Sequence, residues 1–139
     1  MLPIDSFSLQ QHQGHYHEWP LSSLLYYKGQ SLGIRIPGFV IERQFALKDC
    51  YLLLVNWDCP FEEGYEVIVL SHRLKVVGTY SFTPFLNSYL LSSISETAAN
   101  RFQLVFNQNA RFELTIDYPK THWLSRTVRV EKLPARTED

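Results

Sequence analysis

Three histidines near the start of the chain form the densest group of side chains that could do chemistry. His12, His15 and His17 lie within six positions of one another, in the segment 11–19 (QHQGHYHEW). If 15–19 is a strand, His15 and His17 project to the same side, and both imidazole rings could bind one divalent metal ion. We take these three histidines as the candidate metal ligands. The simpler interpretation is that they are polar positions on a solvated arm.

The pair formed by His15 and His17 resembles the first metal-binding motif of the cupin superfamily, whose members are small β-barrels. The resemblance implies a metal-dependent enzyme that uses this pair. The sequence departs from the cupin pattern at Leu21 and Ser22, near where a glutamate is expected. It departs again in 37–41 (PGFVI), where the second motif would lead to a histidine.

The remaining reactive side chains lie around a predicted turn. Asp58, Glu62 and Glu63 could act as acid and base or bind a cation, but their spacing matches no calcium loop, and we interpret them as solvated loop charges. In an extended segment, Cys50 and Cys59 lie more than about 20 Å apart. A disulfide needs Cα atoms within about 7 Å, so we expect two free thiols and a reducing compartment.

Composition describes one globular domain over residues 1–139, with 133–139 as a frayed tail. The chain is 45% hydrophobic, 19% charged and 14% aromatic. Its net charge is −1, and no basic stripe is visible, so we expect neither nucleic-acid binding nor electrostatic membrane binding. The longest apolar run, 51–55, is too short to span a bilayer, and we see no signal peptide. These observations favour a cytoplasmic protein.

Period-two patterning predicts strands along most of the chain. The segment 50–57 (CYLLLVNW) is apolar on both faces, which predicts a central strand covered on both sides. The segments 101–106 and 111–117 predict a hairpin with one apolar face, because Asn tolerates positive φ in the connection. Segment 21–27 could be a short helix or a strand, and 95–100 could be a loop or a single helical turn. Further strands are predicted at 33–36, 39–46, 65–70, 74–82, 85–94 and 127–132.

These strands predict an all-β fold, with an antiparallel meander from about Cys50 to Asp117. Gly78, in the middle of a strand, indicates a bulge or a bend. A long sheet with an apolar face must curl or fold over, which gives a β-barrel or a two-sheet β-sandwich. The short connections between successive strands favour the barrel.

The aromatic side chains suggest a binding function. Near the ends of a barrel they would line an apolar pocket, or else fill the core. We therefore expect a non-enzymatic domain that binds a small apolar ligand or a protein partner, and a homo-oligomer would use the same exposed aromatics. The cupin-like metal-dependent enzyme is the alternative. The pocket candidates are Trp57, Tyr65, Tyr80, Tyr89, Phe106 and Trp123.

Overall fold

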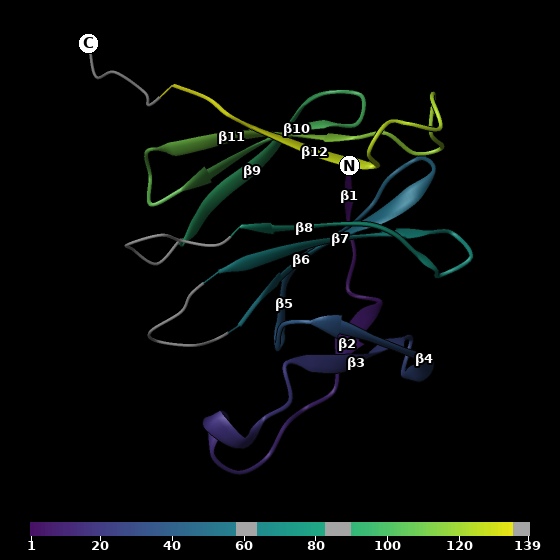
Figure 1. The fold of residues 1–139 in the computed structure, drawn as a ribbon, viewed down its shortest axis with the longest axis vertical. Coiled ribbons are helices and arrows are strands. Elements are labelled where there is room, and N and C mark those ends of the chain that lie inside the picture. The colour runs from purple at the N-terminus through teal and green to yellow at the C-terminus, as the bar shows by residue number, and fades with distance from the viewer. Residues whose placement is uncertain (58–63, 83–89, 135–139) are drawn as a thin grey trace.

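A computed structural model describes residues 1–57, 64–82 and 90–134 and shows an all-β chain. The strands form three antiparallel sheets, which lie as three layers in Figure 1. A five-stranded sheet is the middle layer, with a four-stranded sheet on one side and a three-stranded sheet on the other. Within the described ranges none of the three sheets closes on itself, so the structure does not show the expected barrel.

The middle sheet separates two hydrophobic cores. Its strand order is β1-β5-β6-β7-β8. Because side chains alternate along a strand, Leu52 and Leu54 enter one core while Leu53 and Val55 enter the other. The prediction of a central strand covered on both faces is confirmed for β6, and β7 is buried on both faces as well. The strands are β1 (Leu2–Pro3), β5 (Val40–Ala46), β6 (Cys50–Asn56), β7 (Tyr65–Ser71) and β8 (Val76–Phe82).

The four-stranded sheet packs on the larger core with one face only. It consists of β9 (Leu91–Ala98), β10 (Arg101–Phe106), β11 (Ala110–Ile116) and β12 (Val128–Lys132), in the order β12-β11-β10-β9. The predicted one-sided hairpin is confirmed, and Asn107 in its turn has a φ of 52°. Segment 95–100 differs from the prediction, because β9 continues to Ala98. The buried side chains of the hairpin are Phe102, Leu104, Phe106, Phe112, Leu114 and Ile116.

The three-stranded sheet covers the opposite face of the middle sheet. It contains β2 (Phe7–Leu9), β3 (Ser22–Tyr27) and β4 (Gln30–Pro37), so 21–27 adopts the strand alternative. Phe7, Leu25 and Ile36 are its buried contributions to the smaller core. This core explains why β6 and β7 carry apolar residues at successive positions.

The expected single meander is divided between two sheets. Strands β6, β7 and β8 are consecutive neighbours in the middle sheet, whereas β9, β10, β11 and β12 form the other sheet. The one-sided strands bury their apolar face by stacking on the middle sheet instead of extending it. The expected bulge at Gly78 is confirmed, because Val69 pairs with Gly78 and Leu70 pairs with Val76. Residue 77 is therefore the extra residue of β8.

Helical structure is minimal in the described chain. The 3-10 helix η1 (Tyr16–Glu18) is one turn long. No helix in the described ranges has the length and apolar character needed to cross a membrane.

Candidate functional site

An open groove lies between the edge strand β2 and the part of β5 that β1 leaves uncovered. Strand β1 pairs with β5 only at Phe45 and Ala46, after which the chain crosses to the three-stranded sheet and becomes β2. The Gln44 side chain spans the crossing, since it accepts a hydrogen bond from the Phe7 amide at 2.8 Å and donates to the Phe7 carbonyl at 3.0 Å. Residues of both strands, Gln44 among them, line a groove of about 480 Å³.

Three aromatic rings form one end of this groove. Trp19 and Phe39 meet edge to face with ring centroids 5.1 Å apart, and His12 lies 5.3 Å from each of them. Trp57 extends the cluster, with its ring centroid 5.1 Å from that of Phe39. Edge-to-face packing fixes the orientation of these rings. The groove therefore has an apolar end wall with a titratable imidazole in it.

The hydrogen bonds of His12 determine which of its nitrogens carries the proton. The hydroxyl of the buried Ser23 donates its hydrogen to the Gly38 carbonyl at 2.7 Å. Since a serine hydroxyl has one hydrogen, Ser23 must accept the 2.8 Å contact from His12, and His12 Nε2 is the donor. In the neutral ring, Nδ1 is then the acceptor. One residue that lines the groove therefore carries an acceptor nitrogen when its ring is neutral.

The groove is otherwise a mixture of backbone edge and apolar side chains. Residues 7–12 line one wall, and Val40, Ile41 and Gln44 line the other. Strand β2 is an edge strand, paired only with β3 in the described chain. Edge strands carry unpaired N–H and C=O groups that can pair with another chain. The Phe7 groups are bonded to Gln44, so the lining offers a ligand the main-chain groups beyond Phe7, beside an aromatic end.

The candidate metal ligands do not all meet at one point. His15 and His17 lie at η1, so the expected strand over 15–19 is wrong and the alternation argument does not apply. Their rings nevertheless stack, with centroids 5.4 Å apart. His12 points instead into the aromatic cluster with Trp19 and Phe39. Among the described side chains, no group of three or more His, Cys, Asp or Glu residues is placed to hold a metal ion.

The pocket candidates lie in different parts of the molecule. Tyr65 and Phe106 are 4% and 0% exposed, and their rings pack 5.2 Å apart in the larger core. Tyr80 is half-buried and lies 5.0 Å from Phe82. Trp123 is 80% exposed on the loop between β11 and β12. Trp57 is the candidate that contacts the aromatic end of the groove, and Tyr89 lies outside the described residues.

The two remaining sequence candidates differ in what the structure describes. The acidic turn with Cys59 lies outside the described residues. Cys50 is a free, buried thiol, and burial, together with the charge of Asp49, raises its pKa to about 11. A thiol of this pKa is almost wholly protonated near neutral pH, and reactivity requires the thiolate. Cys50 therefore acts as a small core residue.

The sequence-based interpretation missed Phe39 and the buried Glu66. Glu66 is 8% exposed and accepts hydrogen bonds from Trp57 Nε1 at 3.2 Å and from the Ser81 hydroxyl. An acidic residue inside an otherwise apolar strand, YEVIVL, was the available signal. No comparable signal links Phe39 to His12, because His12 follows β2 and Phe39 precedes β5, and only the fold brings these two segments together.

The chain matches no protein-family model, and comparisons with curated proteins and with solved structures found no significant similarity.

Proposed function

We propose that the protein is a non-enzymatic, sandwich-like domain that binds a protein partner in the groove between β2 and β5. The partner contributes an extended segment, and one of its apolar side chains packs against Trp19 and Phe39. The observation that carries this proposal is the groove of about 480 Å³ bounded by two strand edges and closed by aromatic rings.

Main-chain pairing supports an extended polypeptide as the ligand. Strand β1 covers only two residues of β5, so the stretch of β5 that begins at Val40 has no strand partner on that side within the described residues. An added strand gains main-chain hydrogen bonds from such an edge, and side-chain pockets give it specificity. Val40 lines the groove on this edge, and its side chain is 39% exposed.

The aromatic end supports a specific side chain in that segment. Trp19, Phe39 and His12 present ring faces and edges that suit an apolar or aromatic residue. The acceptor at His12 Nδ1 suits a donor such as a phenol or an indole N–H. We therefore expect tyrosine or tryptophan at the position that meets this cluster.

A small apolar ligand is the other occupant that fits the groove. The volume of the groove lies within the range of roughly 300–1,000 Å³ that is usual for small-molecule sites. Such a ligand would use the aromatic end and leave the strand edges free. The two occupants therefore differ in whether binding depends on β5.

The decisive experiment uses a library of random twelve-residue peptides displayed on phage, selected against the immobilised chain. Selected peptides are then titrated against the wild type and against Val40→Lys, which places a long charged side chain at the mouth of the groove. Val76→Lys is the matched control, because Val76 lies on the opposite edge strand β8 and is also 39% exposed. We expect Val40→Lys to weaken binding about tenfold or more, which corresponds to about 1.4 kcal/mol.

The control variants define the outcomes. Equal binding by the wild type, Val40→Lys and Val76→Lys would contradict the groove as the site. If no peptide is enriched but anilinonaphthalene sulfonate binds and depends on Trp19, the small-ligand alternative is favoured. Sedimentation of the chain alone tests whether the inserted segment belongs to a second copy, since a homo-oligomer formed through the groove would dissociate in Val40→Lys.

A metal-dependent enzyme at His15 and His17 is the second candidate. The stacked rings, 5.4 Å apart, are the observation in its favour. Elemental analysis of untagged protein tests it directly. Stoichiometric metal that is lost in His15→Ala with His17→Ala would support this candidate, and sub-stoichiometric metal would count against it.

A further inference from the structure

The loop of residues 118–126, between β11 and β12, presents two large apolar side chains to solvent. Trp123 is 80% exposed and Leu124 is 67% exposed. In Figure 1 this yellow-green loop stands out from the end of the sheets, at upper right. Two adjacent apolar side chains that are exposed to solvent at the tip of a loop indicate an interaction surface.

Internal hydrogen bonds hold this loop in shape. The Asp117 carboxylate accepts from the Ser125 hydroxyl at 2.5 Å and from the Thr121 amide at 3.2 Å. The Ser125 amide donates to the His122 carbonyl at 3.0 Å, and the Leu124 amide donates to His122 Nδ1 at 3.2 Å. Satisfied amides lower the cost of moving the tip into a medium that is poor in hydrogen-bond partners.

Four exposed cations lie in this loop or next to it on the four-stranded sheet. Lys120 and Arg126 flank the tip on either side. Arg101 and Arg129 stand on the outer face of the four-stranded sheet at the same end, since both pair in register with Thr115 of the strand between them. In the part of the chain that the structure describes, none of the four takes part in an ion pair.

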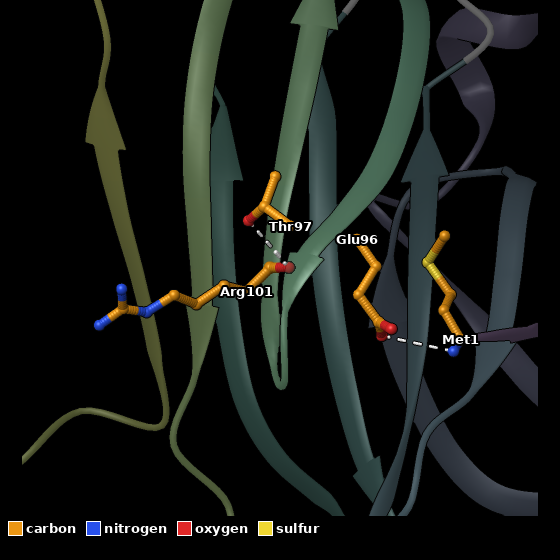
Figure 2. A network of polar contacts seen from close by, with 4 residues as sticks. All are labelled: Met1, Glu96, Thr97 and Arg101. Atoms are coloured by element: carbon orange, nitrogen blue, oxygen red, sulfur yellow. Dashed lines mark hydrogen bonds and ion pairs between the residues drawn. The ribbon is translucent and has the colours of Figure 1, made fainter.

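The nearby acids compensate these cations only in part. Figure 2 shows the Glu96 carboxylate meeting the Met1 amino group, 3.3 Å away, while the Arg101 side chain extends in the opposite direction. The Asp117 carboxylate is hydrogen-bonded to the inside of the loop, and among the four cations it interacts electrostatically with Arg129. Glu113 and Glu131 face each other one row further from the loop. The loop end of the four-stranded sheet is therefore cationic around an apolar tip.

We propose that this end of the domain docks on an anionic lipid surface. Trp123 and Leu124 enter the headgroup region, where tryptophan is favoured, and the four cations contact lipid phosphates. An exposed leucine beside the tryptophan favours lipid over nucleic acid, because leucine offers nothing to base stacking. The sequence predicted no membrane contact, because these cations are scattered between positions 101 and 129 and meet only in the fold.

The test is sedimentation of the whole chain with vesicles, together with tryptophan emission. One set of vesicles is phosphatidylcholine alone, and the other contains phosphatidylglycerol as one third of the lipid. We expect binding and a blue shift with the anionic vesicles, and weakening by salt. Trp123→Ala should weaken binding about tenfold. Lys120→Gln and Arg126→Gln should weaken it about fivefold each.

Matched variants decide the result. Leu21 is 81% exposed outside this loop, so Leu21→Ser controls for the loss of an exposed apolar residue, as Leu124→Ser removes one from the tip. Arg73→Gln, in the exposed turn before β8, controls for charge. The proposal is overturned if the wild type does not bind anionic vesicles, or if Trp123→Ala binds them as tightly as the wild type does. It is also overturned if the chain binds a single-stranded DNA oligonucleotide but not the vesicles. Val40→Lys should bind vesicles normally, which separates this surface from the groove.

Discussion

At the scale of single residues, His12 shows how position in the fold decides what a reactive side chain does. The sequence places it beside His15 and His17 as a metal ligand. In the structure its Nε2 donates to Ser23, and its ring packs against Trp19 and Phe39. Proximity in sequence did not bring the three imidazoles together, because the chain turns at Gly14, which has a φ of 85°. His12 belongs to the groove.

Asp117 is the residue whose charge state stabilises the loop of residues 118–126. The hydrogen bond from Ser125 is the largest cause that holds the pKa of Asp117 below its ordinary value, and Thr121 and Arg129 act in the same direction. A carboxyl with a lowered folded-state pKa contributes stability above its unfolded pKa of about 3.9, and this contribution is lost as the pH falls through the folded value.

We therefore expect Asp117→Asn to lower the urea midpoint relative to the wild type at pH 7, and to lower it less below about pH 4. The measurement is urea unfolding of both proteins at several pH values. Asp5→Asn removes an exposed carboxylate outside the loop and controls for net charge. A difference between Asp117→Asn and the wild type that does not change with pH would contradict the role assigned to the charge.

At the scale of elements, the sequence predicted strands well and their partners poorly. Alternation identified the hairpin of β10 and β11, because burial of one face gives a period of two, and a continuous apolar run identified the two-sided strand β6. Pairing depends on contacts between distant segments, so the crossing from β1 to β2 left no local signal. The groove between β2 and β5 follows from that crossing and could not be predicted.

The bulge in β8 shows the same limit within one strand. Strict alternation places Val76 on the same face of β8 as Tyr80 and Phe82. The extra residue of the bulge shifts the alternation by one position, so Val76 is 39% exposed and Val77 packs against the larger core. The sequence located the bulge through Gly78 but did not say which residues it would turn outward.

Gly78 also sets the distance between two sheets. A Cβ atom at this position would lie 2.8 Å from Thr127 Cγ2 and 2.9 Å from Val128 Cγ2, and both of these neighbours are buried. We expect Gly78→Ala to destabilise the domain by about 1–3 kcal/mol through overpacking. Chemical denaturation measures this change. Thr79→Ala, at the exposed next position of β8, should cost much less, and equal effects of the two substitutions would contradict the close contact.

At the scale of the whole molecule, the two cores are unequal. Of the described residues, sixteen are buried in the core between the middle and four-stranded sheets, and seven in the core on the other face. Of the described residues in the three-stranded sheet, Phe7, Leu25 and Ile36 are the buried apolar contributions to that smaller core. Local opening is easiest where few apolar contacts hold an element. The sheet that borders the groove is therefore the layer that opens most readily.

Leu25 and Leu104 allow a matched test of this inequality, because both are leucines with 0% exposure, one in each core. Leu104→Ala should cost about 2–5 kcal/mol and raise amide exchange throughout the middle and four-stranded sheets. Leu25→Ala should raise exchange mainly in β2, β3 and β4, because that sheet can open while the larger core stays packed. Native-state hydrogen exchange resolved by segment measures both effects. If Leu25→Ala raised exchange equally in β10 and β11, the three layers would unfold as one unit, and a partner that orders the groove would then stabilise the whole domain instead of the outer sheet alone.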